Sequence, residues 1–114
     1  MSTMNTAEDI HAFQDEEGYL IDPEQWDASV ARYLARTEEL ELVADHWKVI
    51  GFMRSFYDEH RVAADARFVI RFLDRECGYG RLAKRRLFEL FPYGYVKQAC
   101  KIAGMRRPRA WSTG

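Results

Sequence analysis

Apolar residues recur at helical spacing in five successive segments of this 114-residue chain. The segments span 22–37, 45–60, 64–76, 82–91 and 95–103. Asp22-Pro23-Glu24 is a typical helix start, and Gly104 stands where a glycine often ends a helix. In the segment 45–60 the apolar positions cover most of the circumference, which is typical of a central, buried helix. The pattern therefore predicts a mainly α fold, a compact bundle of about five helices with short connections.

The stretch before the first helix has a different pattern. Residues 10–13 alternate, residues 14–18 supply turn chemistry, and Tyr19-Leu20-Ile21 is apolar and β-prone. This predicts a short N-terminal β-hairpin, in which Gly18 takes the position that most needs a positive φ angle. Because a lone hairpin is marginally stable in water, it is expected to pack on the helices.

The two ends of the chain lack such patterns. Residues 1–8 are polar and are expected to be loose. Residues 105–114 show no periodicity and are expected to form a flexible C-terminal arm after a single domain over residues 1–104. The chain has no apolar run long enough for a membrane span and no apolar secretory signal near its start. A cytoplasmic location without membrane association is therefore expected.

Charge is distributed unevenly, although the net charge is only −1. Residues 1–80 carry 17 acidic and 8 basic side chains, a net of −9. Residues 81–114 carry nine basic side chains against Glu89 alone, a net of +8. Such a basic third can steer an anionic partner to one end of the molecule, or it can attract the acidic body of the same chain.

Few residues are arranged for catalysis. The three histidines are widely spaced, and no glycine-rich loop resembles a phosphate-binding loop, so neither a metal nor a cofactor is predicted. The adjacent acids Glu16-Glu17 and Glu38-Glu39 are expected to be solvated surface. The residues alone give no argument for an enzyme active site.

Cys100 has the strongest argument for reactivity. The cations near it in sequence are Lys97, Lys101, Arg106, Arg107 and Arg109. Nearby cations stabilise the thiolate, which attacks disulfides and accepts sulfane sulfur. Cys100 also continues an apolar stripe with Val96, Ala99 and Ala103, which indicates instead a small thiol packed inward. The two interpretations are equally supported, whereas Cys77 resembles an ordinary helix-end residue.

The helices expected at 45–60 and 64–76 have the outline of a helix-turn-helix. The second carries three arginines against three acids, so it is neutral where a groove-binding helix is expected to be basic. Two packed helices without a DNA contact are therefore favoured. If nucleic acid binds anywhere, the basic segment 81–109 is the better candidate.

Two blocks near the C-terminus are distinctive. They are Leu90-Phe91-Pro92 followed by Gly94, and Lys97-Gln98-Ala99-Cys100-Lys101-Ile102-Ala103-Gly104. The upstream residues that accompany them are Gly18-Tyr19-Leu20, Trp26, His46-Trp47, Phe52, Arg54, Phe56 and Tyr57. Together they closely resemble the DsrC/TusE sulfur-relay family, which includes the gamma subunit of dissimilatory sulfite reductase. The resemblance spans about residues 9–110 in one register.

The resemblance implies a small orthogonal helical bundle with an N-terminal hairpin and a flexible C-terminal arm. In the family, the arm carries sulfur as a persulfide, or as a trisulfide between two cysteines, and inserts into partner enzymes. One of these cysteines matches Cys100. The other, the penultimate residue and main sulfur carrier, falls at Trp111, so this chain is a divergent member without that carrier. Further departures are Tyr93 and Tyr95 around Gly94, and Arg106-Arg107-Pro108 after Gly104.

The leading hypothesis is a divergent sulfur-relay protein that docks to sulfur-trafficking or sulfite-reductase-type partners, with Cys100 as its only plausible redox or persulfide thiol. It is expected to be a carrier or accessory protein, sulfurtransferase-like at most. Its expected partner-binding residues are Lys97, Lys101, Arg106, Arg107, Arg109 and Trp111. The alternative is a regulatory nucleic-acid-binding protein of helix-turn-helix type that uses residues 81–109.

Overall fold

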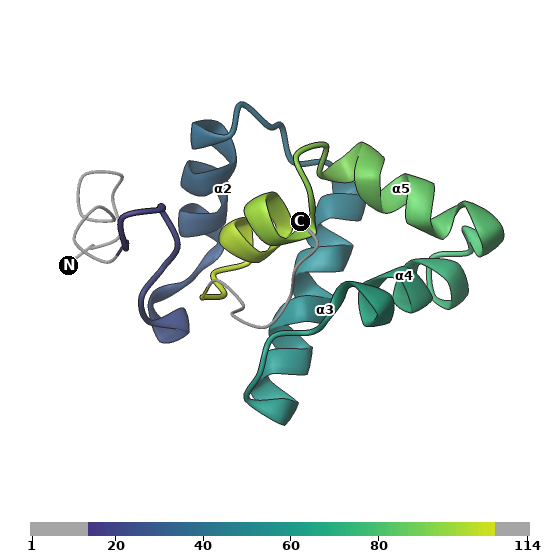
Figure 1. Cartoon of the computed structure of the whole chain (residues 1–114), viewed down its shortest axis with the longest axis horizontal. Helices are drawn as coiled ribbons and strands as arrows, with labels where there is room; N and C mark the ends of the chain where they lie inside the picture. The colour runs from purple at the N-terminus through teal and green to yellow at the C-terminus, as the bar shows by residue number, and fades with distance from the viewer. Residues whose placement is uncertain (1–13, 107–114) are drawn as a thin grey trace.

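A computed structural model describes residues 14–106. Its elements are η2 (Pro23–Gln25), α2 (Ala28–Thr37), α3 (Ala44–His60), α4 (Ala66–Arg75), η3 (Gly80–Leu82), α5 (Ala83–Leu90) and the π-helix η4 (Tyr95–Cys100). Helix α3 runs through the middle of the molecule, with α2 and η4 on one side of it and the α4–α5 pair on the other (Figure 1). The predicted mainly helical, compact fold of about five helices is confirmed.

Helix α3 forms the centre of the core. Val49, Ile50 and Met53 are each at most 1% exposed. In its first turn the Val43 N–H donates to Nδ1 of His46 at 2.9 Å. The imidazole therefore satisfies a backbone donor at the helix start, and the Asp45 side chain is left to bind other partners.

The first predicted helix is divided in two. Asp22 and Pro23 start only the single 3-10 turn η2, and the backbone is extended again at Trp26. Asp27 then caps α2, since its carboxylate accepts the Val30 N–H at 3.0 Å. The second aspartate therefore restarts the helix, and the break between η2 and α2 leaves Trp26 outside both.

The expected N-terminal β-hairpin is not supported. Among residues 14–106 no strand is formed, and a single antiparallel bridge joins Gln14 to Leu20 across the turn. Gly18 does adopt a positive φ of 91°. Tyr19 and Leu20 are buried against the helices, and Pro23 soon follows and cannot donate to a strand ladder. Packing on the core and the start of η2 therefore replace a second strand.

The last predicted helix, residues 95–103, takes an unexpected form. Residues 95–100 form a π-helix, and one helical turn follows it at Lys101 and Ile102. Gly94 precedes it with φ 106°, and Gly104 ends it with φ 79°, as a C-cap glycine should. Because π-helical turns are often found at functional sites, this segment is the natural place to look for one.

Several expectations concern residues outside the described range. These are the loose residues 1–8, the strand residues 10–13, and Arg107, Arg109 and Trp111 of the arm. Between Gln14 and Arg106, no helix has the length and apolar character that a membrane crossing requires.

Candidate functional site

Trp26 and Arg54 hold the chain where it leaves the helical body. The Trp26 indole N–H donates to the Ile102 carbonyl at 2.8 Å. The Arg54 guanidinium donates to the carbonyls of Ala103 at 3.1 Å and Pro23 at 3.0 Å, and it lies 4.5 Å from the centre of the Trp26 ring. Two side chains from distant parts of the sequence thus satisfy the carbonyls that the end of a helix leaves free.

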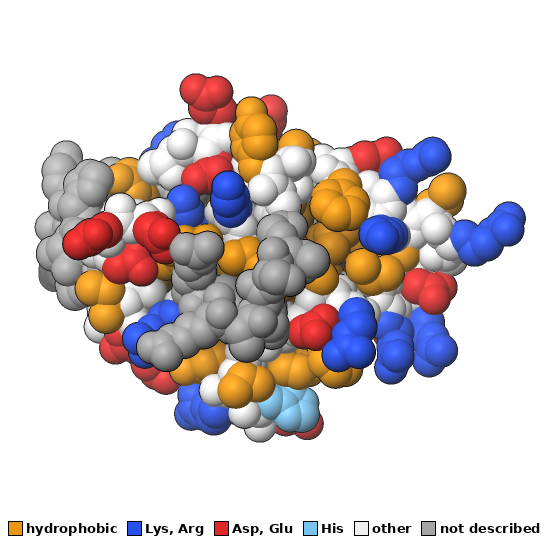
Figure 2. Space-filling view, in the orientation of Figure 1, with side chains coloured by type: hydrophobic (Ala, Val, Ile, Leu, Met, Phe, Trp, Pro, Cys, Tyr) orange, Lys and Arg blue, Asp and Glu red, His pale blue; other side chains and the backbone are white. Residues whose placement is uncertain are grey.

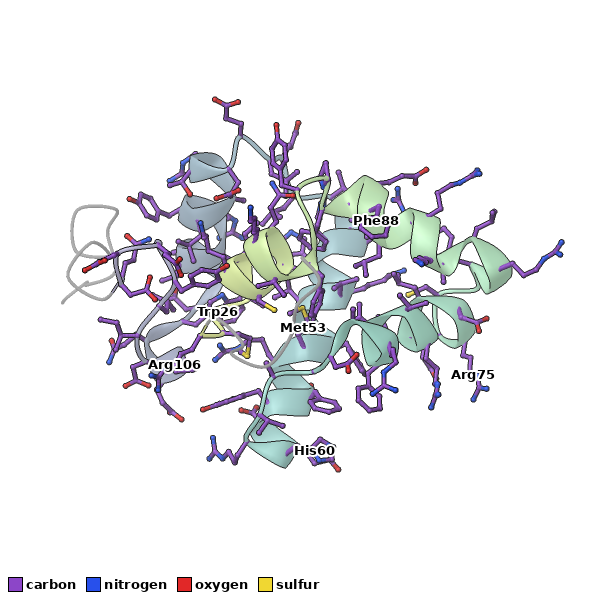
Figure 3. The ribbon with its side chains drawn as sticks, viewed as in Figure 1. Trp26, Met53, His60, Arg75, Phe88 and Arg106 are labelled. Atoms are coloured by element: carbon purple, nitrogen blue, oxygen red, sulfur yellow. The ribbon has the colours of Figure 1, made fainter. Side chains whose placement is uncertain are left out.

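Gly104 completes this arrangement, which we call the arm root. A Cβ at this position would lie 2.4 Å from Cδ1 of Trp26, and φ is 79°. Met105 is 1% exposed, and its N–H donates to the Cys100 carbonyl at 2.9 Å, so packing continues one residue past the glycine. Arg106 is exposed (Figure 3). The arm therefore begins at a fixed point on the body.

Cys100 lies inside the arm root and is fully buried, with 0% exposure. Burial raises the pKa of its thiol to about 12, and a hydrogen bond with Tyr95 opposes this only in part. Lys97 is exposed and Lys101 turns to another partner, so the flanking lysines do not supply the expected stabilisation of a thiolate. In this conformation the thiol is protonated and packed inward, and its role as a sulfur or redox thiol stays a prediction.

Cys77 is the more accessible of the two free cysteines, since it is partly exposed after the end of α4. Burial still raises the pKa of this thiol above its ordinary value of 9.0. No sequence signal distinguished it. Its accessibility makes it the necessary control for any experiment on Cys100.

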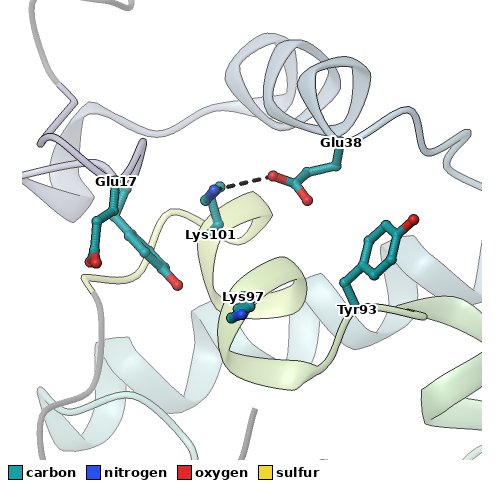
Figure 4. A pocket seen from close by; sticks show the side chains of 6 residues that line it. Glu17, Glu38, Tyr93, Lys97 and Lys101 are labelled. Atoms are coloured by element: carbon teal, nitrogen blue, oxygen red, sulfur yellow. Dashed lines mark hydrogen bonds and ion pairs between the residues drawn. The ribbon is translucent and has the colours of Figure 1, made fainter.

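A polar cleft of about 560 Å³ lies over η4 (Figure 4). It is lined by Glu17, Tyr19, Glu38, Tyr93, Lys97 and Lys101. Lys101 Nζ is 3.1 Å from Oε2 of Glu38, with both side chains less than 20% exposed, and it lies 5.2 Å from the centre of the Tyr19 ring. Glu38 was expected to be solvated surface, and this is wrong, because the helix end of α2 brings it to Lys101.

Gln98 and Tyr19 fix the walls of this cleft. Buried Gln98 accepts the Tyr93 N–H at 2.9 Å and donates to Oε1 of Glu38 at 3.3 Å. The Tyr19 hydroxyl donates to the Val96 carbonyl at 3.0 Å. These bonds tie η4 to the turn before it, to α2 and to the N-terminal turn.

The predicted site residues fall into three groups. Lys97 and Lys101 lie together in the cleft, Arg106 lies beyond the arm root, and Arg107, Arg109 and Trp111 lie outside the described residues. Lys97 forms no ion pair among residues 14–106, so it is the cleft cation available to a partner. Over the same residues, no three His, Cys, Asp or Glu side chains are grouped to hold a metal ion.

The comparisons with known proteins agree on one family. The family model for DsrC like protein matches residues 6–110. The chain belongs to the DsrC-like family. Sulfurtransferase TusE of Buchnera aphidicola subsp. Acyrthosiphon pisum is 40% identical over 95 residues, which cover 83% of each chain. Sulfurtransferase TusE of Salmonella typhimurium is 39% identical, over 82% of this chain and 86% of the relative.

Solved structures of the family share its fold. DsrC from Allochromatium vinosum superposes with a TM-score of 0.76 and 36% identity, covering 87% of this chain and 88% of that one. The oxidized gamma-subunit of the dissimilatory sulfite reductase from Archaeoglobus fulgidus gives a TM-score of 0.71 and 31% identity, covering 86% and 90%. The resemblance inferred from the residues is therefore confirmed. Trp26, Arg54 and Gly104, which are part of that resemblance, meet at the arm root.

The comparisons give the nucleic-acid alternative no support. Helix α4, the would-be recognition helix, begins with an arginine that is paired with an acid, since Arg67 Nη2 is 3.2 Å from Oδ2 of Asp65. Three arginines and three acids in this segment cancel. Helices α3 and α4 are therefore a packed pair within the family fold.

Proposed function

We propose that this protein works in sulfur relay by docking to a sulfur-trafficking or sulfite-reductase-type partner through the arm and the cleft over η4. The family match over residues 6–110 carries the proposal, because it includes the helical body and the first residues of the arm. Arg106, Arg107, Arg109 and Trp111 of the arm are its expected contacts, together with Lys97. Arginine and tryptophan are the residue types most often found at binding hot spots.

The arm root supports this proposal. Trp26 and Arg54 fix the carbonyls of Ile102 and Ala103, so the start of the arm is held at one place on the body. A segment whose root is fixed loses less freedom when its end inserts into a partner than a free tail would. Lys97 lies in the cleft that adjoins η4, where it can contact an acidic group of the same partner.

Sulfur chemistry at Cys100 requires the buried thiol to open. A thiol with a pKa of about 12 is protonated at neutral pH, so it attacks a persulfide or disulfide slowly. We propose that a partner bound to the arm pulls on the root and exposes the thiol. Cys100 would then accept one sulfane sulfur, as the donor's persulfide transfers its terminal sulfur to the thiolate and leaves as a thiol.

Two measurements test the proposal. Intact mass after incubation with a sulfane-sulfur donor should show at most one or two added sulfurs, and Cys100→Ser should abolish them while Cys77→Ser does not. Modification that survives in Cys100→Ser would transfer the role to Cys77.

The docking part is tested separately with a sulfite-reductase-type enzyme or a sulfurtransferase donor from the same organism. Trp111→Ala and Lys97→Glu should each weaken binding by about tenfold, the usual size of a hot-spot loss. Arg71→Glu, an equal change of charge at an exposed residue of α4 outside the cleft, should not. Equal binding by all three variants would exclude this surface.

A further inference from the structure

The outer face of α5 carries exposed residues that neither the fold nor the cleft uses. They are Arg81, Leu82, Lys84, Arg85 and Phe88, and we call them the α5 face. Leu82 is 54% exposed and Phe88 is 48% exposed, which is high for large apolar side chains. Figure 3 shows Phe88 on α5, well separated from Trp26 at the arm root.

Helical spacing brings these five residues together. Lys84 and Phe88 are four residues apart, and Arg85 and Phe88 are three apart, so each pair lies on one side of α5. Arg81 and Leu82, in the preceding turn η3, continue the same face toward its start. The opposite side, with Ala83, Leu87 and Leu90, is buried in the core. The face is therefore a continuous strip of three cations and two apolar side chains.

The cations of the α5 face are unpaired in the part of the chain that the structure describes. Among residues 14–106, Arg81, Lys84 and Arg85 form no ion pair. Arg86, in the same helix, shows the contrast, because it is bonded to Asp45 at 3.0 Å and to Glu89 at 3.1 Å. The Tyr79 hydroxyl also donates to the Asp45 carboxylate, and these bonds fix α5 against α3. Arg86 is thus neutralised by acids of the described chain, in contrast to its neighbours on the α5 face.

The charge also differs between the two ends of the molecule. In Figure 2 the acidic side chains gather beside the turn at residues 15–18, at the left end, and Lys and Arg side chains gather over the α4–α5 pair, at the right end. Such a separation orients the molecule as it approaches a charged surface. An acidic partner would therefore be steered to the α4–α5 end, which includes the α5 face.

We propose that the α5 face is a docking surface for an acidic protein partner with apolar residues at the centre of its contact. Three cations around two apolar side chains match the usual anatomy of an interface, an apolar centre with a polar rim. A nucleic-acid backbone would leave Leu82 and Phe88 against phosphates, which they cannot bind.

This inference adds a second contact, away from the arm, to the docking described above. It rests on the proposed function only in assuming that the protein has a partner. The three cations mainly speed association and orient the partner as it approaches. Phe88 and Leu82 stabilise the complex, because their apolar surface is removed from water. A partner that holds the α5 face leaves the arm free to insert.

The test uses a synthetic helical peptide with glutamates surrounding two leucines on one face, added to the isotope-labelled full chain. Backbone amide shifts should change at residues 81–88, and the dissociation constant should rise several-fold between about 50 and 200 mM salt. Reversal of Arg81, Lys84 and Arg85 to Glu should weaken binding by at least about tenfold, and Phe88→Ala by about fivefold. Reversal of Arg71 and Arg75 on α4 is the control for overall charge, and it should weaken binding by less than about twofold.

Other outcomes would overturn the proposal. Shifts confined to Lys97 and Lys101 would place acidic partners in the cleft instead. Phe88-dependent dimers in sedimentation without peptide would make a second copy of the chain the occupant. Tighter binding of a short DNA duplex than of the peptide at physiological salt would make nucleic acid the ligand. Any of these results leaves the sulfur-transfer and Trp111 experiments unaffected, so the two proposals fail separately.

Discussion

The basic C-terminal third of the chain divides into two regions that use their charge in opposite ways. At the arm root and η4, Lys101 is neutralised by Glu38, and neutral side chains such as Gln98 satisfy the backbone. On the α5 face, Arg81, Lys84 and Arg85 have no ion-pair partner among the described residues. A run of cations in sequence is therefore not one surface. The charge of Lys101 stabilises the fold, whereas the charges of Arg81, Lys84 and Arg85 stay available to a partner.

The arm root should be much less tolerant of substitution than the α4–α5 end. Gly104→Ala should lower the free energy of unfolding by about 3 kcal/mol, because left-handed strain of about 1–2 kcal/mol adds to a Cβ placed 2.4 Å from Trp26. Urea unfolding of both proteins measures the difference.

Gly78→Ala is the matched control for this experiment. Gly78 has almost the same φ, 78°, but no atom lies within 4 Å of the added Cβ. It should cost only the strain, about 1 kcal/mol. Equal losses for the two variants would show that Trp26 moves aside and that the root is not rigid.

The two cysteines should differ strongly in reactivity. A pKa of about 12 leaves so little thiolate at neutral pH that Cys100 should react with iodoacetamide at least about 10²-fold more slowly than an ordinary exposed thiol. Cys77, partly exposed, should be modified first. Mass spectrometry of the native protein over time follows both sites, and unfolding in urea should equalise them. Comparable native rates would show that the root opens readily on its own.

His46 joins the start of α3 to the end of α5 and should make stability depend on pH. Its Nδ1 accepts the Val43 N–H, so Nε2 carries the proton and donates to the Leu90 carbonyl at 2.7 Å, at the end of α5. Burial lowers the pKa of this imidazole below its ordinary 6.5. The unfolded chain therefore binds a proton before the folded one as pH falls below 6.5, and stability is lost.

The expected loss is about 1 kcal/mol between pH 7.5 and 5.5. Urea unfolding across this range measures it, and His46→Gln should remove the slope while lowering stability at every pH. A slope retained in His46→Gln would assign the titration to another group.

Much of this fold could be predicted, but its connections could not. The helical spacing located all five helices because their buried faces are long and periodic, as in Val49, Ile50 and Met53 of α3. The first helix is divided because Asp27 caps a new helix five residues after Asp22. The Trp26 indole, between the two parts, donates to the Ile102 carbonyl. Contacts between residues 76 positions apart leave no local signal.

The sequence predicted several of the residues that belong to the candidate site but not how they are arranged in space. Sequence neighbours suggested that Lys97 and Lys101 activate Cys100, yet the wide π-helical turn puts the thiol in the core and both lysines in the cleft. Glu38 looked like surface because its partner comes 63 residues later. The family signature did identify Trp26, Arg54 and Gly104, although only the fold shows that they meet.

The smallest expected effect on stability distinguishes a paired cation, Lys101, from an unpaired one, Lys84. Lys101→Met should lower stability by about 1 kcal/mol, because it leaves the mostly buried Glu38 carboxylate with Gln98 as its remaining donor. Lys84→Met should change stability by less than about 0.5 kcal/mol, since an exposed lysine without a partner contributes little. A double-mutant cycle of Lys101→Met with Glu38→Gln measures the coupling energy of this pair. A second cycle, of Lys84→Met with Glu38→Gln, should give no coupling energy. If Lys84→Met proved as costly as Lys101→Met, the α5 face would have a structural role, and its cations would not be free for a partner.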